Sequence, residues 1–324
     1  MLGTDVALAA EILRKGGLVA FPTETVYGLG GDAASEVAAA KIFTVKGRPR
    51  AHPLIAHLAP GADLDGWARE IPADARRLVE AAWPGPLTVI LKAGPRVAKA
   101  TTGGADTVGL RVPSHPVAIE LLRAFGGGVA APSANRFGHV SPTTAQHVLA
   151  DFGEDVDYIL DGGACSVGVE STIVDFSRGR PVLLRPGGMA REAIEAIVGP
   201  LGGADAHAPA APGTLASHYA PNALVIAVEP DEVIAEVARA AGRRVAVLAP
   251  ANAFQAWPGL TAERYALPDD DAGMARELYA ALRDLDVRGV DVVIAALPPA
   301  VGLGEAVGDR LRRAAGPRQK PETP

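Results

Sequence analysis

Short apolar runs alternate with amphipathic stretches of helical spacing along most of this chain of 324 residues. A helical pattern at residues 5–15 is followed by a strand-like run from residue 18, and the two patterns keep alternating as far as residue 198. This alternation restricts the fold to the α/β or α+β class. Between residues 158 and 184, however, strand-like runs follow each other without a helix. The sheet is therefore predicted to be mixed rather than purely parallel.

A change in composition divides the chain into parts. Its length exceeds the roughly 250 to 300 residues that one hydrophobic core usually serves. Residues 202–222 are rich in Ala, Pro and Gly and show no apolar period, as is typical of an extended linker. From residue 223 the alternation returns and resembles a small, parallel, doubly wound domain. We predict an α/β domain at 1–205, a linker at 206–222, a Rossmann-like domain at 223–316 and a disordered tail at 317–324.

The charge balance and the single cysteine exclude several classes of protein. The chain has 31 Lys and Arg against 37 Asp and Glu, so neither half is a polycationic arm for nucleic acid. Cys165 is the only cysteine, which excludes an intramolecular disulfide and a zinc site built from several cysteines. The apolar run at residues 292–304 contains two prolines and is too short to span a bilayer. These features predict a soluble, cytoplasmic protein that does not contact a membrane.

Residues 28–33 (GLGGDA) formally fit the dinucleotide fingerprint G-x-G-x-x-A after a strand. The context does not fit, because residues 22–27 separate the strand from the glycines and because Arg48 and Arg50 stand where an acidic residue should bind a ribose. The chain also lacks the phosphate loop G-x-x-x-x-G-K-[ST] and the motifs H-E-x-x-H and G-x-S-x-G. The common nucleotide, zinc and serine-hydrolase interpretations are therefore without support.

A basic loop, residues 46–55 (KGRPRAHPLI), is the clearest candidate for a ligand site. Residues 37–62 contain four Lys or Arg and no Asp or Glu, although the chain is acidic overall. A solvated turn is the alternative interpretation of Lys46 and Arg48. Two prolines and a glycine restrict the backbone, and a guanidinium can hold phosphate oxygens in a bidentate manner. We therefore favour a phosphate-bearing ligand.

Polar residues follow another short apolar run, at residues 129–135 (VAAPSAN). The end of a strand is where α/β proteins usually gather ligand contacts, so Ser133 and Asn135 are candidates, although both are also common turn formers. The segment at residues 141–144 (SPTT) is typical of a helix start with a hydroxyl near the cap. Such a start also offers amide donors to an anion.

Two arginines and a serine on predicted strands need a role besides packing. Arg111 lies in the strand-like run TVGLRVP and would be costly to bury without a partner, which is either a structural ion pair or a ligand carboxylate. Ser171 lies in a β-branched run that core packing otherwise explains. Arg185 ends a strand-like run and is a second candidate to hold phosphate.

Seven fragments between residues 22 and 187 occur in a characteristic order: PTETVYGLG, KGRPRAHPLIAHL, TVGLRVP, APSAN, SPTTAQHV, VESTIVD and LRPG. Together they resemble the YrdC-like family of L-threonylcarbamoyl-AMP synthases, and the linker and C-terminal domain resemble its long, two-domain members. The resemblance implies a YrdC-like domain with a twisted mixed sheet. It also implies a nucleotidyltransferase that joins L-threonine, bicarbonate and ATP into threonylcarbamoyl-AMP and pyrophosphate, the first step of threonylcarbamoyladenosine modification of tRNA.

The resemblance also assigns residues to roles. The catalytic signature of the family falls here on Lys46, Arg48, Ser133 and Asn135. The residues implied for L-threonine are Thr25, His57, Arg111, the backbone of Ala131, and Ser171. The residues implied for ATP are Arg48, His52, Thr107, Ser133, Ser141, Arg185 and, from the linker, Tyr219. Position 52 is often Asn in relatives, and either side chain offers a hydrogen-bond donor. Mg²⁺ is implied with the ATP, without a metal site made by protein residues.

Tyr219 stands within the linker in the sequence Ser-His-Tyr, which its Pro- and Ala-rich surroundings do not explain. In the long members of the family a linker tyrosine reaches back over the nucleotide, so the resemblance implies that the linker is a lid. Alternatively, Tyr219 fixes the linker to a domain surface. The two interpretations are compatible.

A different class of function, a double-stranded RNA or tRNA-binding module without catalysis, is the alternative. The near-neutral charge of the first half and the lack of aromatic residues between its basic residues argue against RNA as the main ligand. The family resemblance implies two further partners. One is tRNA, through a local contact, and the other is a separate transferase that receives the product.

Overall fold

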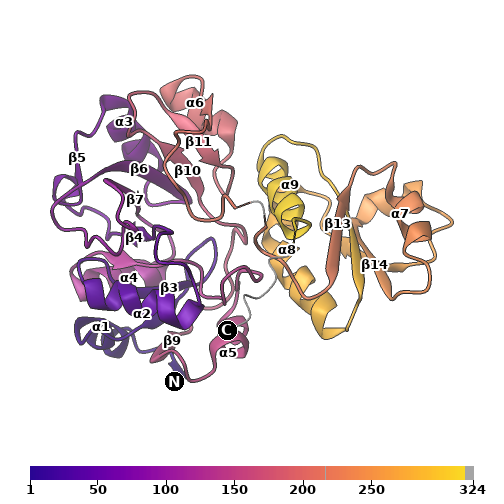
Figure 1. Cartoon of the computed structure of the whole chain (residues 1–324), viewed down its shortest axis with the longest axis horizontal. Coiled ribbons are helices and arrows are strands. Elements are labelled where there is room, and N and C mark those ends of the chain that lie inside the picture. Colours follow the sequence, from indigo (N-terminus) through magenta and orange to yellow (C-terminus); the bar gives the residue numbers. More distant parts are fainter. Residues whose placement is uncertain (216, 318–324) are drawn as a thin grey trace. The chain divides into compact units, whose positions relative to one another are not determined.

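The computed structural model describes residues 1–215 and 217–317. The described chain forms two compact units (Figure 1). The first contains Met1–Phe137 and Ser141–Thr214, and the second contains Gly138–Val140 and the chain from Leu215 onward. Of the tail predicted at residues 317–324, all but Pro317 lies outside the described residues.

A mixed sheet forms the centre of the first unit. Its strands are, in spatial order, β1 (Leu2–Gly3), β9 (Tyr158–Leu160), β2 (Val19–Phe21), β3 (Gly28–Asp32), β8 (Val129–Ala130), β4 (Ile55–His57), β7 (Thr107–Arg111), β6 (Leu87–Ala93), β10 (Thr172–Asp175), β11 (Val182–Arg185) and β12 (Gly202–Gly203), and β5 (Ala68–Arg69) pairs with β6. Parallel pairs such as β4 with β7 occur beside antiparallel pairs such as β6 with β7. The predicted mixed sheet is therefore confirmed.

Helices cover both faces of this sheet. They are α1 (Val6–Arg14), α2 (Glu36–Lys46), α3 (Ala73–Ala82), α4 (Pro116–Phe125), α5 (Ala145–Phe152) and α6 (Arg191–Val198), with a 3-10 turn at Leu64–Gly66. Successive residues of β2 point to opposite faces. Val19 and Phe21 join a core with α1 and α4, whereas Ala20 joins a core with α2, α3, α5 and α6. The first unit therefore has three layers.

The second unit is a small parallel α/β domain. Its strands lie in the order β13 (Leu224–Val228), β16 (Val292–Ala296), β14 (Val245–Pro250) and β15 (Glu263–Leu267), and each neighbouring pair is parallel. Helices α8 (Asp271–Val287) and α9 (Leu303–Ala314) lie on one side of this sheet, and α7 (Val233–Arg239) lies on the other (Figure 1). A 3-10 turn covers Ala251–Ala256. This confirms the predicted Rossmann-like fold.

Several of the described strands were not predicted from the sequence, and β3 and β15 are the longest of them. In the sequence the glycines at residues 28–30 follow a strand-like run as part of a fingerprint motif, but in the structure they begin a strand of their own, β3. This strand is rich in glycine because its neighbours approach closely: a Cβ atom on Gly30 would lie 2.8 Å from side-chain atoms of both Phe21 and Val129. Strand β15 was also missed, because it is a largely exposed edge strand without apolar alternation.

Candidate functional site

Strand directions bring four of the predicted residues to one edge of the first sheet. Strand β4 is parallel to β7, with His57 opposite Arg111. Strand β6 is antiparallel to β7 and parallel to β10, and β10 is antiparallel to β11. The last residues of β4, β7 and β11, and the residue before β10, therefore lie at the same edge. These residues are His57, Arg111, Arg185 and Ser171.

Arg111 has a buried carboxylate partner that the sequence analysis did not identify. Its Nη2 atom lies 2.7 Å from Oε1 of Glu24, and each side chain is only 5% exposed. Its Nη1 donates to Oγ1 of Thr25 at 2.8 Å, and its Nε donates to the carbonyl of Gly85 at 3.3 Å. A buried guanidinium requires such partners. Glu24 is the only acidic residue of the PTETVYGLG fragment, which is the signal that could have indicated it.

His57 is buried beside this ion pair. Burial is the main cause that lowers its pKa to about 3, and the positive charge of Arg111 lowers it further. Its Nδ1 lies 3.3 Å from the carbonyl oxygen of Ile55, and its ring meets Phe21 edge to face. His57 is therefore a neutral imidazole near pH 7, able to form hydrogen bonds without adding a second cation next to Arg111.

Ser171 and Arg185 are joined directly. The guanidinium of Arg185 donates to the carbonyl oxygen of Ser171 at 2.8 Å and to its hydroxyl at 3.2 Å. The Ser171 hydroxyl also lies 2.7 Å from Oγ1 of Thr88. One residue before Ser171, the carboxylate of Glu170 accepts a 2.6 Å hydrogen bond from the hydroxyl of Ser141. Ser141, Ser171 and Arg185 are thus linked. Glu170, whose role the sequence analysis missed, joins Ser141 to the other two.

Lys46 connects the basic loop to the turn that carries Ser133 and Asn135. It is the last residue of α2, and Gly47 ends the helix in a left-handed conformation with φ of 63°. The Nζ atom of Lys46 donates to the carbonyl oxygens of Ser133 and Asn135. Burial, followed by the charge of Arg48, lowers the pKa of Lys46 well below its usual value. The amino group of Lys46 therefore fixes the backbone of the turn through these two hydrogen bonds.

Arg48 and His52 meet on an aromatic ring that the sequence analysis missed. The guanidinium of Arg48 lies 5.7 Å from the centre of the Phe137 ring, and the His52 ring meets the same ring edge to face at 5.6 Å. Arg48 also donates to the carbonyl of Pro53 at 3.1 Å. Burial, followed by the charge of Arg48, lowers the pKa of His52. Phe137 follows Asn135 by two residues, so it joins the basic loop to the same turn.

Residues 22–30 connect the Arg111 group with the Lys46 group. Thr25 accepts the hydrogen bond from Arg111. Two residues later, the amide of Tyr27 donates to Pro142 and its carbonyl accepts from Ala134. The amide of Leu29 donates to Pro132. One continuous segment therefore contacts Arg111 through Thr25, and it contacts the turn of Ser133 and Asn135 through Tyr27 and Leu29.

Thr107, Ala131 and Tyr219 are the other predicted residues. Thr107 begins β7, at the opposite end of the strand from Arg111. The amide of Ala131 donates to the carbonyl of Ile55 at 2.9 Å. Tyr219 belongs to the second unit, where its buried ring contacts Tyr279 and Arg310.

The described residues contain no cluster of three or more His, Cys, Asp or Glu that could hold a metal ion. Cys165 is a free, buried cysteine, and burial raises the pKa of its thiol to about 12. It is therefore a thiol rather than a nucleophilic thiolate. Within residues 1–215 and 217–317, no helix is both long enough and apolar enough to cross a membrane.

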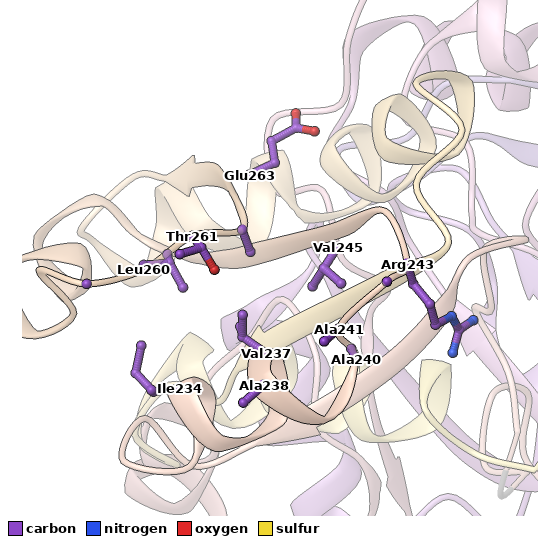
Figure 2. Close-up of a pocket in the computed structure, with 13 residues that line it drawn as sticks. Ile234, Val237, Ala238, Ala240, Ala241, Arg243, Val245, Leu260, Thr261 and Glu263 are labelled. Carbon is purple, nitrogen blue, oxygen red and sulfur yellow. The ribbon is translucent and has the colours of Figure 1, made fainter.

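A groove of about 530 Å³ lies in the second unit between α7 and the residues that lead into β15 (Figure 2). Its apolar floor includes Val237, Val245 and Leu260, which pack against the core of the unit. Arg243 and Glu263 supply the charged side chains of its lining. None of the predicted site residues lines this groove, so it is a separate feature.

Comparison with known proteins assigns both parts of the chain. A sequence profile of the Sua5, YciO and YrdC proteins, described as "Telomere recombination", matches residues 11–187. A second profile, for the C-terminal domain of threonylcarbamoyl-AMP synthase, matches residues 189–316.

Individual relatives cover nearly the whole chain. The threonylcarbamoyl-AMP synthase of Pyrococcus abyssi is 43% identical over 97% of this chain and 94% of its own length. That of Bacillus subtilis is 40% identical with the same coverage. A crystal structure of Pyrococcus abyssi Sua5 complexed with L-threonine matches with a TM-score of 0.89 and 42% identity, over 96% of this chain and 94% of that one. The chain therefore belongs to the threonylcarbamoyl-AMP synthase family, in its two-domain form.

Proposed function

We propose that this threonylcarbamoyl-AMP synthase works as a nucleotidyltransferase that joins L-threonine, bicarbonate and ATP and releases pyrophosphate. The observation that carries this proposal is the connection, through residues 22–30, of a buried arginine group with a turn held by Lys46. The first group suits an amino-acid carboxylate, and the basic loop suits phosphates. We assign catalysis to residues 1–205, a linker to 206–222 and a C-terminal domain to 223–316.

L-Threonine is proposed to bind at the edge of the sheet formed by β4, β7 and β10. The guanidinium of Arg111 and the hydroxyl of Thr25 would donate to its carboxylate, and Glu24 holds the guanidinium in place. The neutral imidazole of His57 would make a hydrogen bond in the same place without attracting the carboxylate away from Arg111. Ser171 and the backbone of Ala131 complete the proposed set. The complex of L-threonine with Pyrococcus abyssi Sua5 supports this class of ligand.

ATP is proposed to bind beside this pocket, along the basic loop and the turn. The proposed contacts are Arg48, His52, Thr107, Ser133, Ser141, Arg185 and Tyr219. Arg48 and Arg185 would neutralise phosphate charge, because each presents a guanidinium on a fixed backbone. Lys46 acts on the nucleotide mainly through the turn, since its ammonium donates to two carbonyl oxygens of that turn. Ser133 and Asn135 would orient the carbamate and the nucleotide.

The proposed chemistry needs positioning rather than a covalent enzyme intermediate. The threonine amine first attacks the carbon of bicarbonate, and water leaves to give a carbamate. A carbamate oxygen then attacks the α-phosphorus of ATP, and the bond to pyrophosphate breaks in line with the attack. Charge moves toward the leaving group in this step, so fixed cations and hydrogen-bond donors lower its barrier.

Mg²⁺ is compatible with this site as a companion of ATP. Magnesium usually keeps several waters and binds through few carboxylates together with substrate phosphates. The residues proposed for ATP are cationic, hydroxyl-bearing or aromatic, and the nearby Glu170 already accepts from Ser141. The ion would therefore be held by the triphosphate oxygens and would neutralise their charge.

The proposed setting is tRNA modification in the cytoplasm, with a possible local contact to tRNA and a separate transferase as the consumer of the product. The reducing cytoplasm fits a chain whose single cysteine is a free, buried thiol. The product is a reactive mixed anhydride, so a short path to the transferase would limit its hydrolysis.

Release of pyrophosphate from ATP by the purified chain tests the proposal. The release should require both L-threonine and bicarbonate. Arg48→Met should reduce the rate by about 100-fold, the effect of losing one donor to transition-state charge. Arg50→Met is the matched control, because Arg50 is an exposed arginine two residues away, and it should keep the wild-type rate. A chain that binds double-stranded RNA but releases no pyrophosphate would instead be an RNA-binding module.

A further inference from the structure

The residues Gly138–Val140 belong to the second unit, although the chain on both sides of them belongs to the first. On one side they follow Phe137, the ring that contacts Arg48 and His52. On the other side they precede Ser141, which donates to Glu170. In the chain, the segment therefore lies directly between Phe137, which contacts two residues proposed for ATP, and Ser141, which is itself proposed for ATP.

Each of the three residues of this segment has a contact within the second unit. The carbonyl of Gly138 accepts from the amide of Ala220 at 2.9 Å, and His139 forms a parallel bridge with the same residue. The carbonyl oxygen of Val140 accepts from the guanidinium of Arg283. Val140 is only 3% exposed, so its carbonyl group needs a donor from the protein. Arg283 supplies that donor.

Arg283 is carried by a rigid element. It lies on α8, a helix of 17 residues whose buried face includes Leu278, Tyr279 and Leu282. This helix begins with a cap in which the side chain of Asp270 accepts from the amide of Gly273. A guanidinium on such a helix is a donor at a fixed place, and it can fix the carbonyl group that it contacts.

We infer that Arg283 is a positioning residue for ATP binding, which it supports through the backbone of residues 138–140. This inference rests on the proposed function and extends it to a residue of the C-terminal domain. Without the guanidinium, the Val140 carbonyl loses its charged donor and the segment loses a contact with α8. The neighbouring Phe137 and Ser141 then lose their fixed positions, and the ATP site is disturbed. Of the residues proposed for L-threonine, Thr25, His57 and Arg111 make their hydrogen bonds and ion pair outside residues 138–140, so threonine binding is affected less than ATP binding.

The test compares Arg283→Met, Arg283→Lys and the control Arg276→Met, which removes an arginine that is 49% exposed on the same helix. Direct titration with ATP gives the Kd, steady-state pyrophosphate release gives KM for ATP and for L-threonine, and thermal unfolding gives Tm.

Arg283→Met should raise Kd and KM for ATP about 10-fold, as expected for loss of a hydrogen bond to a charged donor. It should leave KM for L-threonine within about 2-fold, and Arg283→Lys should recover most of the ATP affinity because it keeps a cationic donor. Arg276→Met should match the wild type.

Two outcomes would overturn the inference. One is an unchanged Kd for ATP in Arg283→Met. The other is a parallel loss for ATP and L-threonine together with a lower Tm, which would show a purely structural role. Failure of the proposed function is recognised separately, because the wild-type chain would then release no pyrophosphate, while its ATP titration would still report on Arg283.

Discussion

The contacts of Arg111 fit both a structural role and the proposed role in binding a carboxylate. Its burial beside Glu24 answers the need of a buried cation for a counter-charge. The same guanidinium keeps an orientation set by Thr25 and Gly85. A side chain fixed in this way loses little entropy when a ligand carboxylate arrives. The ion pair and the ligand contact, which the sequence presents as alternatives, can therefore belong to one arrangement.

Replacing Glu24 by Gln should destabilise the chain, because it leaves the guanidinium of Arg111 buried without its counter-charge. The free energy of unfolding, measured by urea denaturation, should fall by about 3 kcal/mol, as for other broken buried ion pairs. KM for L-threonine should rise as Arg111 loses its orientation. Glu70→Gln is the matched control, since Glu70 pairs with Arg69 and Lys92 at the surface. The interpretation fails if both variants unfold at the same urea concentration.

His57 should make stability depend on pH. Its pKa is about 3 in the folded chain, whereas its ordinary value is 6.5, so the unfolded chain binds the extra proton between these values. Above pH 6.5 the buried His57 therefore does not lower the free energy of unfolding. As the pH falls from 6.5 toward 3, the free energy of unfolding decreases by up to about 1.4 kcal/mol per pH unit. Denaturation from pH 7 to 4 should show a flatter pH dependence for His57→Gln. The exposed His207→Gln should keep the wild-type dependence. Equal slopes for all three proteins would contradict this origin.

At the scale of elements, the end of α2 determines how the basic loop begins. Gly47 has a φ of 63° and ends the helix between Lys46 and Arg48. The loop that follows turns back, so that the amide of Phe137 donates to the carbonyl of Lys46 at 2.9 Å. One residue with a left-handed conformation therefore lets Lys46 face the turn while Arg48 reaches Phe137.

Gly47→Ala should lower stability without any steric clash, because a Cβ atom at this position would have no heavy atom within 4 Å. The cost is that of a left-handed conformation for alanine, about 1 kcal/mol, or about 2 to 4 °C in Tm for a unit of this size. Gly203→Ala is the control, since its Cβ atom would also meet nothing within 4 Å and its φ is not positive. Thermal unfolding should show little change for Gly203→Ala. A similar Tm for both variants would show that the left-handed conformation is not the cause.

Elements also explain where sequence patterns failed. Most of the described helices and strands follow the alternation of apolar and amphipathic runs that the sequence shows. Strand β3 was missed because its glycines are set by contacts with Phe21 and Val129, which lie on neighbouring strands. Its strand character comes from its neighbours rather than from its own residues.

At the scale of the whole molecule, the linker residue Tyr219 is held by the second unit. It has a φ of 62°, which is unusual for a bulky residue and persists only where the surroundings fix it. Its ring contacts Tyr279 at 5.7 Å and lies 5.1 Å from the guanidinium of Arg310. These contacts agree with a tyrosine that fixes the linker, and they leave its proposed contact with ATP to be tested.

Tyr219→Ala and Tyr279→Ala distinguish the two roles of the linker tyrosine. If Tyr219 covers the nucleotide, its removal should raise the Kd for ATP about 10-fold, as expected for loss of one stacking contact of about 1 to 3 kcal/mol. Tyr279→Ala removes the packing partner and should lower Tm while leaving the Kd for ATP within about 2-fold. Titration with ATP and thermal unfolding measure both effects. If both variants lower Tm and neither changes the Kd, the lid hypothesis is wrong.

The sequence by itself determined the α/β class, the mixed sheet, the second parallel domain and the types of residue at the candidate site. These follow from patterns that repeat along the chain with the period of a helix or a strand, and from motifs that keep their order. Only the tertiary structure decided that Glu24 pairs with Arg111, that Lys46 donates to Ser133 and Asn135, and that His57 is neutral. Such partners are far apart in the sequence, and the cost of burying a charge depends on every neighbour that folding brings to it.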